Sequence, residues 1–274
     1  MNFRTIFFSC LFFASLASNA AVVDTVSIYS QAMNKTLKCI VIRPDKPKGK
    51  KAAWPVVYLL HGHGGWYSNW ILRVPELSRY ADAFRMMIVC PDGHNSSWYI
   101  DSPVDSTMRY ETHIAKEIPA FIDANYPTIK KREARAITGL SMGGYGGLFI
   151  GFRHSDHFGA CGSMSGVMDL NASRNRLDIQ KRIGDTIQYA DNWKKYSMLQ
   201  VVEKRPEDSL AILIDCGMGD TFFPSNKALH EKMLQLKIPH EYIERPGKHD
   251  WNYWRYAVKF QLFFFRTYFD KNRY

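Results

Sequence analysis

Short, continuously hydrophobic runs alternate with longer stretches of helical periodicity along most of this chain. The apolar runs are typical of strands that are buried on both faces of a sheet, and they cover residues 55–60, 86–90, 136–139, 160–164 and 210–217. Apolar residues recur at helical spacing between them, over residues 106–126, 225–236 and 251–269. This alternation predicts an α/β fold with a mainly parallel central sheet flanked by helices.

The pattern changes at the ends of the predicted sheet and in one internal segment. Residues 22–31 and 37–43 alternate or run apolar around Asn34-Lys35, which predicts a hairpin at one edge of the sheet, and residues 240–244 form the last predicted strand. Residues 165–209 are polar and irregular, with a short helical piece at 177–183. So long an insertion between two strands is a candidate cap over a substrate site, and structural padding is the alternative.

The first twenty residues differ in composition from the rest. Arg4 precedes an apolar run from Ile6 to Ala14, and small residues follow at Ser18-Asn19-Ala20. The run is too short to span a membrane, and the pattern is typical of a secretory signal cleaved after Ala20. We therefore predict that residues 21–274 form one domain that is secreted or periplasmic and has no membrane segment after cleavage; a membrane-anchoring helix is the alternative.

Cysteine usage and charge limit the kinds of partner. Without the signal, four cysteines remain in apolar runs, where free thiols behave as small hydrophobes, at Cys39, Cys90, Cys161 and Cys216. They have no close Cys or His spacing, so we predict buried thiols and no metal site, with disulfides left open.

The formal net charge is +10, with basic clusters between Lys35 and Lys51 and between Lys130 and Arg135. Neither cluster is interleaved with aromatic residues, so we predict solvated faces and no nucleic-acid partner. An acidic polysaccharide would also suit this charge.

The run at 136–139 ends in the motif Gly139-Leu140-Ser141-Met142-Gly143 and leads into a helical stretch. A serine at a tight strand-to-helix turn has its hydroxyl exposed above the sheet, and small neighbours let strand and helix pack closely. The amide of Met142 would lie at the helix N-terminus, where an oxyanion is favoured. This spacing predicts that Ser141 is a nucleophile; a glycine-rich turn with a bystander serine is the alternative.

The partners of a nucleophile can be sought at other strand ends. Asp220 follows the predicted strand 210–217, and His249 follows the last predicted strand. The order nucleophile, acid and histidine is that of α/β-hydrolases, in which histidine acts as general base and the acid orients it. Asp215 lies within its strand and is the weaker candidate for the acid.

A glycine loop, His61-Gly62-His63-Gly64-Gly65, follows the strand 55–60. Glycines beyond a central strand allow backbone amides to face a ligand, so the amide of His63 is the candidate second oxyanion donor. No carboxylate lies beside these histidines at ligand spacing, so the loop does not predict a metal site.

These motifs together resemble the esterase D-like family of α/β-hydrolases. The resemblance rests on the glycine loop, the serine motif, Arg109-Tyr110-Glu111-Thr112, Asp215-Cys216-Gly217 with Asp220, and Gly247-Lys248-His249-Asp250-Trp251-Asn252-Tyr253-Trp254. The family contains S-formylglutathione hydrolases, feruloyl and acetylxylan esterases of the first carbohydrate-esterase family, and mycolyltransferases. The resemblance implies a triad of Ser141, Asp220 and His249, oxyanion donors on His63 and Met142, and no cofactor.

Aromatic residues fall in the loops expected near this site, and we predict substrate contacts at Trp66, Trp98, Tyr99 and Phe222. We therefore expect an exported serine esterase that removes feruloyl or acetyl groups from plant polysaccharide or from a small ester. The alternatives are an acyltransferase with a sugar acceptor, a general esterase similar to S-formylglutathione hydrolases, and a noncatalytic carbohydrate-binding protein. The sequence leaves the oligomeric state open.

Overall fold

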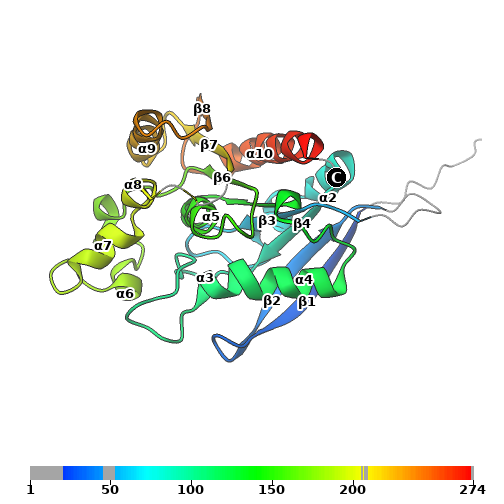
Figure 1. Ribbon diagram of the computed structural model, residues 1–274, viewed down its shortest axis with the longest axis horizontal. Helices are drawn as coiled ribbons and strands as arrows, with labels where there is room; N and C mark the ends of the chain where they lie inside the picture. Colours follow the sequence, from blue (N-terminus) through cyan, green and yellow to red (C-terminus); the bar gives the residue numbers. More distant parts are fainter. Residues whose placement is uncertain (1–20, 46–52, 205, 207–208, 273–274) are drawn as a thin grey trace, which may run out of the picture.

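The computed structural model describes residues 21–45, 53–204, 206 and 209–272. Its centre is an eight-stranded sheet in the order β1-β2-β4-β3-β5-β6-β7-β8 (Figure 1). The strands are β1 (Val22–Ser30), β2 (Lys35–Arg43), β3 (Val56–Leu60), β4 (Met87–Pro91), β5 (Arg135–Gly139), β6 (Ala160–Met164), β7 (Ala211–Gly217) and β8 (Glu241–Arg245). The pairs from β4 to β8 are all parallel, which confirms the predicted fold class.

The antiparallel part of the sheet lies at the edge that the sequence predicted. β1 and β2 form a hairpin through Asn34, which has φ 49°, and β2 pairs antiparallel with β4. Asparagine tolerates this left-handed conformation better than most residues. The five residues of β3 are all fully buried, as their continuous apolar run predicted.

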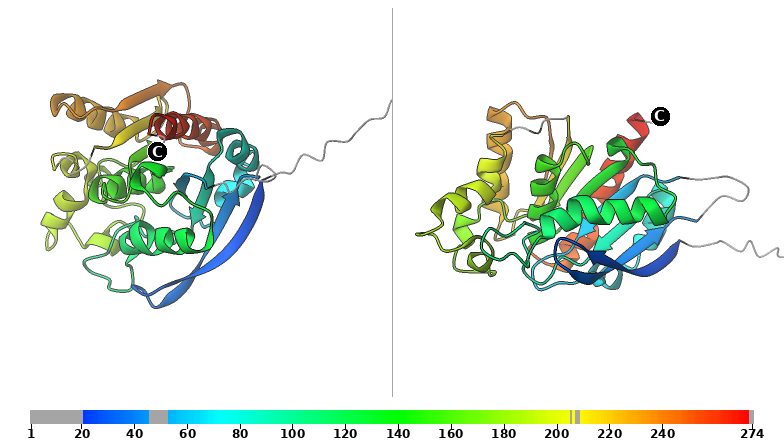
Figure 2. Two further views of the ribbon diagram at one scale, coloured as in Figure 1. Left: turned by 45° about the vertical axis from the view of Figure 1, so that its right-hand side comes forward. Right: turned by 60° about the horizontal axis from the view of Figure 1, so that its bottom comes forward.

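Helices cover both faces of the sheet, and two separate hydrophobic cores result (Figures 1 and 2). One face carries α1 (Asn69–Arg73), α2 (Leu77–Phe84) and α10 (Trp251–Lys271). The other carries the π-helical segment η1 (His113–Glu117), α4 (Ile118–Asn125), α5 (Met142–Arg153) and α9 (Phe223–Gln235). The short helix α3 (Tyr110–Thr112) leads into η1, and its Tyr110 packs in a small separate cluster. Short 3-10 turns, η2 (Arg132–Ala134) and η3 (Asn171–Ser173), complete the connections.

The helix predicted over 106–126 begins later than expected and contains an irregularity. It starts at Tyr110, and its five residues from His113 to Glu117 are π-helical. Pro119 lies just after this segment. Since proline has no N–H group, one helical hydrogen bond is missing there, which explains the local widening of the helix.

The segment 165–209, called the cap below, contains α6 (Gln180–Ile183), α7 (Ala190–Tyr196) and α8 (Met198–Val201). Several of its side chains belong to the same core as α5, among them Val167, Ile183, Trp193 and Met198. The described part of the cap is therefore packed onto the domain. It lies beside α5 at the left of Figure 1.

The structure also bears on the predicted state of the cysteines and on the predicted absence of a membrane segment. Cys39, Cys90, Cys161 and Cys216 are all buried free thiols, as predicted. Among the described residues, no helix has the length and apolar character that a membrane crossing requires. The predicted signal sequence lies outside the described residues.

Candidate active site

Ser141 occupies the tight turn between β5 and α5. Its backbone has φ 53° and ψ −115°, a strained conformation for a residue with a side chain. The turn is possible because glycines flank it. A Cβ at Gly139 would lie 2.5 Å from the carbonyl oxygen of Leu60, and one at Gly143 would lie 2.6 Å from that of His61. The motif therefore folds as the sequence predicted, with β3, β5 and α5 in close contact.

The structure brings together the three residues predicted as a triad. His249 Nε2 lies 2.9 Å from Ser141 Oγ, and His249 Nδ1 lies 2.8 Å from Asp220 Oδ2. A carboxylate can only accept hydrogen bonds, so Nδ1 carries the proton and Nε2 is free to accept from the serine hydroxyl. Ser141 and Asp220 are buried, whereas the His249 side chain is 25% exposed. The base thus has an open side toward solvent.

Two aromatic rings hold the histidine in place. Phe222 and Trp254 each pack edge to face against the His249 ring, with centroid distances of 4.9 and 4.8 Å. The amide of Phe222 also donates a 2.7 Å hydrogen bond to Asp220 Oδ1. Because Oδ1 is occupied by this amide, the other carboxylate oxygen is directed at His249. Phe222, predicted as a substrate contact, thus lies against His249, the candidate base, whereas the contact of Trp254 with this ring was not predicted.

Asp215, the rejected candidate acid, supports the loop that carries His249. Its carboxylate is fully buried and accepts hydrogen bonds from Tyr253 and, at 2.6 Å, from Arg245. Burial raises the pKa of Asp215 to about 6, against the opposing effect of these two donors. Tyr253 in turn fills the space beside Gly247, where a Cβ would lie 2.1 Å from its ring. Asp215 is therefore structural, as the sequence indicated.

The two candidate oxyanion donors lie on either side of the serine. Within the part of the chain that the structure describes, the amides of His63 and Met142 donate to no acceptor. The loop that carries His63 passes directly beside the nucleophile, since a Cβ at Gly62 would lie 3.5 Å from Ser141 Cβ. Free amides at a helix start and in an adjacent loop are the arrangement that an oxyanion requires.

His61 fixes this loop, a role that the sequence did not reveal. Its buried ring accepts a 2.8 Å hydrogen bond from the amide of Gly93 on Nε2, so Nδ1 carries the proton and donates to the carbonyl oxygen of Gly62. Burial lowers the pKa of His61 and keeps the ring neutral. The carbonyl of His61 accepts from the hydroxyl of Tyr99. The loop is thus held from both sides.

Comparison with known proteins agrees with this geometry. The family model described as "Putative esterase" matches residues 30–262, most of the chain. This protein belongs to the esterase family. An acetyl esterase of Caldicellulosiruptor saccharolyticus is 28% identical over 84% of this chain and 92% of its own length. A solved ferulic acid esterase is 28% identical with a TM-score of 0.77, covering 90% of this chain and 99% of its own.

A third relative performs a different reaction. The diacylglycerol acyltransferase/mycolyltransferase Ag85A of Mycobacterium gordonae is 25% identical over 86% of this chain and 78% of its own length. The family and the serine-hydrolase fold together make this esterase a serine carboxylesterase.

The aromatic residues predicted to contact substrate lie in different environments in the esterase. Trp98 and Tyr99 are 1% and 0% exposed, so their rings belong to the core and have no surface to offer a substrate. Trp98 donates from Nε1 to the carbonyl of Leu177 in the cap, and Tyr99 holds the loop of His61. Trp66 is 48% exposed in the loop that follows His63. The buried rings of Trp98 and Tyr99 thus support the loops around the site. Trp66, which is exposed, is the candidate substrate contact.

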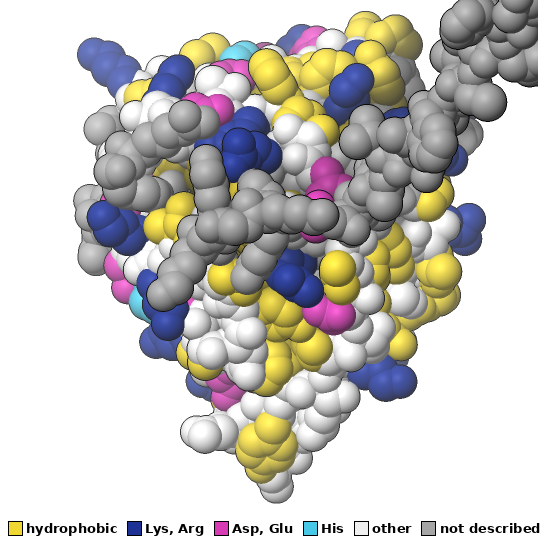
Figure 3. All heavy atoms as spheres, turned by 90° about the vertical axis from the view of Figure 1, so that its right-hand side faces the viewer, with side chains coloured by type: hydrophobic (Ala, Val, Ile, Leu, Met, Phe, Trp, Pro, Cys, Tyr) yellow, Lys and Arg dark blue, Asp and Glu magenta, His cyan; other side chains and the backbone are white. Residues whose placement is uncertain are grey.

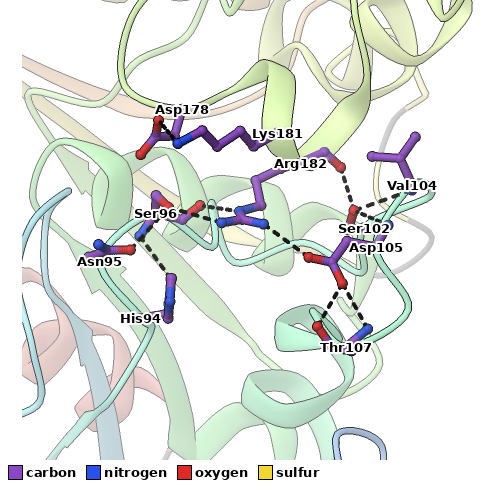
Figure 4. Close-up of polar contacts among 10 residues, drawn as sticks. All are labelled: His94, Asn95, Ser96, Ser102, Val104, Asp105, Thr107, Asp178, Lys181 and Arg182. Carbon is purple, nitrogen blue, oxygen red and sulfur yellow. Dashed lines mark hydrogen bonds and ion pairs between the residues drawn. The ribbon is translucent and has the colours of Figure 1, made fainter.

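The cap of the esterase is joined to the oxyanion loop through Arg182 (Figure 4). Its guanidinium donates to the carbonyl oxygen of Ser96 at 3.0 Å and to Asp105 at 3.2 Å. The neighbouring carbonyl of Asn95 accepts a 2.7 Å hydrogen bond from the amide of Gly64, one residue after His63. Arg182 therefore anchors the segment that contacts the oxyanion loop. No motif or spacing pattern around Arg182 in the sequence indicated this role.

The cap also approaches the oxyanion loop directly. Asp178 Oδ2 lies 3.8 Å from His63 Nε2 and 36% of its side chain is exposed. Burial lowers the pKa of His63. A cap residue thus lies within reach of the predicted oxyanion donor, so the segment is a wall of the site as well as part of the core.

One group of potential metal ligands occurs among the described residues. His154, Asp156 and His157 offer atoms within 4.8 Å of one another at the far end of α5 from Ser141. His154 Nε2 lies 2.9 Å from Glu111, and His157 Nδ1 lies 2.8 Å from Asp156. Each histidine thus has a carboxylate partner, which accounts for the cluster without an ion.

Proposed function

We propose that this protein is an exported serine carboxylesterase that hydrolyses carbohydrate-linked esters through an acyl-enzyme on Ser141. The observation that carries the proposal is the hydrogen-bonded chain from Ser141 Oγ through His249 to Asp220, at 2.9 and 2.8 Å. Export is proposed from the sequence of residues 1–20 alone. No cofactor is required, because nucleophile, base and oxyanion donors are all parts of the chain.

In the first half-reaction, Ser141 Oγ attacks the ester carbonyl while His249 Nε2 takes its proton. The developing oxyanion accepts hydrogen bonds from the amides of His63 and Met142, and Asp220 stabilises the imidazolium. Collapse of the tetrahedral intermediate breaks the bond to the sugar oxygen, which leaves with the proton from His249. In the second half-reaction, water attacks the acyl-enzyme with the same base, and the free acid and Ser141 are regenerated.

The proposed acyl groups are feruloyl and acetyl. The names of two relatives support this choice, a ferulic acid esterase and an acetyl esterase, each 28% identical to this chain. Trp66 and Phe222 offer partly exposed rings near the site, on which a hydroxycinnamoyl group or a sugar can stack.

Specificity constants on a matched panel test this proposal: methyl ferulate, an acetylated xylo-oligosaccharide and a short p-nitrophenyl ester, with Ser141→Ala as the control. A preference for either natural ester supports the proposed substrate class and identifies the acyl group. Activity confined to the activated nitrophenyl ester contradicts that class but leaves the esterase mechanism standing. Full activity of Ser141→Ala contradicts the mechanism itself.

A second candidate is acyl transfer to a sugar hydroxyl, favoured by the match to a mycolyltransferase. The acyl-enzyme would be the same, and a sugar would replace water in the second half-reaction. Product analysis in the presence of an added sugar acceptor separates the two. A transferred ester as the main product supports the transferase, and free acid as the main product supports the esterase.

A further inference from the structure

A cleft of about 890 Å³ lies at the end of α5 that is remote from Ser141. One wall is formed by η1 and the end of α5, and the other by α7 and α8 of the cap. Its cationic lining residues are Lys116, Arg153, Lys194, Lys195 and Lys204. A second hollow of about 500 Å³ shares Lys116, Arg153, His154 and Lys195 with the first, so the two are continuous. Because α5 rises by about 1.5 Å per residue, the cleft lies about 16 Å from the nucleophile.

The charges in this cleft are unbalanced. Among the described residues, four carboxylates line the two hollows, and each has a partner of its own. Glu111 pairs with Arg153, and the remaining pairs are Asp101 with Arg109, Asp156 with His157 and Glu203 with Lys232. In contrast, Lys116, Lys194, Lys195 and Lys204 form no ion pair with any carboxylate in the described ranges. Four exposed lysines, one on η1, two on α7 and one just after α8, therefore line one cavity; Lys195 also lies over the ring of Tyr196, with Nζ 5.4 Å from the ring centroid.

This arrangement differs from the charge elsewhere on the molecule. In the basic clusters noticed in the sequence, several of the described side chains have partners: Lys35 lies over the ring of Tyr110, Lys38 lies over the ring of Tyr67, and Arg135 pairs with Asp123. On the face opposite the cap, the visible Lys and Arg side chains are scattered between acidic and hydrophobic ones (Figure 3). In the cleft, by comparison, four lysines that have no carboxylate partner among the described residues line a single cavity.

The lining also indicates the class of ligand. The two Phe and Tyr residues in its described lining, Phe152 and Tyr196, are 6% and 4% exposed, so this part of the lining presents neither ring for stacking on a nucleobase. Ammonium groups on flexible stems attract anionic groups without the fixed geometry of a guanidinium fork. A ligand with several charges at intervals therefore fits better than a single phosphate. The cavity volume is ample for several sugar units.

We propose that this cleft binds an anionic oligosaccharide whose carboxylates lie against Lys116, Lys194, Lys195 and Lys204. The choice of a saccharide rests on the proposed function, because an esterase acting on a polysaccharide would meet uronate groups on the same polymer. The cleft is separate from the catalytic centre, so it holds the polymer at a distance from the ester that reacts. Binding there is expected to raise the local concentration of ester groups near Ser141.

Isothermal titration calorimetry on Ser141→Ala tests this directly, since no turnover is needed. The titrants are a galacturonic acid oligomer of about eight units and a neutral xylo-oligosaccharide of equal length. We expect binding of the acidic oligomer only, weakened as salt is raised because the contacts are exposed. Replacing the four cleft lysines by glutamine should reduce its affinity by about tenfold or more.

A matched control removes the same charge elsewhere, with glutamine in place of Lys130, Lys227, Lys237 and Lys259, which are exposed outside the cleft. Equal loss in both quadruple variants would show general attraction to a basic protein and overturn the proposal. So would no binding of the acidic oligomer, or equal binding of the neutral one. Single-stranded DNA is a further titrant. If it binds as tightly as the acidic oligomer and loses affinity in the cleft variant, the choice of a saccharide is overturned.

Esterase activity on a p-nitrophenyl ester is measured with lysine variants that retain Ser141. This activity is expected to stay within twofold of that of the unmodified protein. This readout separates the two proposals. Binding without esterase activity would contradict the proposed function alone, whereas activity without binding would contradict the cleft alone.

Discussion

The carboxyl ends of β5, β7 and β8 and the cap are held in place by different kinds of contact. At the strand ends, each of the three proposed triad residues follows its own strand by a few residues, and the hydrogen bonds between them join side chains to side chains. The cap is held mainly through backbone carbonyls, such as those of Leu177 and Tyr196, which accept from Trp98 and Tyr145. The contacts at the strand ends therefore depend on the identity of particular side chains. The position of the cap depends instead on backbone acceptors and on buried packing.

Removing the orienting acid should have the largest effect. In Asp220→Asn, the amide can place an N–H group against His249 Nδ1, so the ring is held in the wrong tautomer for accepting the serine proton. By the general behaviour of such triads, kcat is expected to fall by about 10⁴. Steady-state kinetics on a p-nitrophenyl ester measure this. Asp250→Asn is the neighbouring control and changes only the N-cap of α10; equal losses in both variants would contradict the assignment of Asp220.

Asp215 should affect stability with a defined pH dependence. Its pKa is raised from 3.8 to about 6 by burial, so ionisation is unfavourable in the folded state. The stability that this group contributes is fully present below pH 4 and is lost as pH rises through 6, by roughly 3 kcal/mol. Urea unfolding at pH 4.5 and pH 7.5 should therefore show a smaller destabilisation by Asp215→Asn at the higher pH. The reverse order would contradict the burial argument.

Arg182 tests whether the cap positions the oxyanion loop. Arg182→Gln should lower kcat by about tenfold with little change in KM, because it loosens the segment at Ser96 that holds Gly64. Arg176→Gln, an exposed cap arginine, is the matched control. If KM alone changes, or if both variants behave alike, Arg182 is a general structural residue of the cap.

Trp66 should show the smallest effect and the clearest substrate dependence. Its ring is half exposed beside the oxyanion loop, so Trp66→Ala should raise KM for methyl ferulate by about threefold. Hydrolysis of a p-nitrophenyl acetate, whose acyl group is too small to reach the ring, should change less. Equal changes for both substrates would remove Trp66 from the acyl-binding surface.

The contrast between the two regions also explains what the sequence could predict. The strand pattern, the edge hairpin and the meeting of Ser141, His249 and Asp220 follow from local signals, because a buried run, a glycine-flanked serine and a strand-end histidine each have few structural interpretations. Trp98 and Tyr99 could not be separated from exposed rings by type alone, since both lie in a loop with left-handed φ values that turns them inward. The roles of His61 and Arg182 depend on backbone acceptors distant in sequence, Gly93 and Ser96, which no spacing reveals.

The central claim is that Ser141 is the activated nucleophile of an esterase, and a covalent label tests it most directly. The protein is treated with a fluorophosphonate, digested and analysed by mass spectrometry. We predict one adduct, on Ser141, absent from Ser141→Ala and retained in Ser165→Ala, whose serine is fully buried on the neighbouring strand end. An adduct on another residue, or undiminished labelling of Ser141→Ala, would contradict the account.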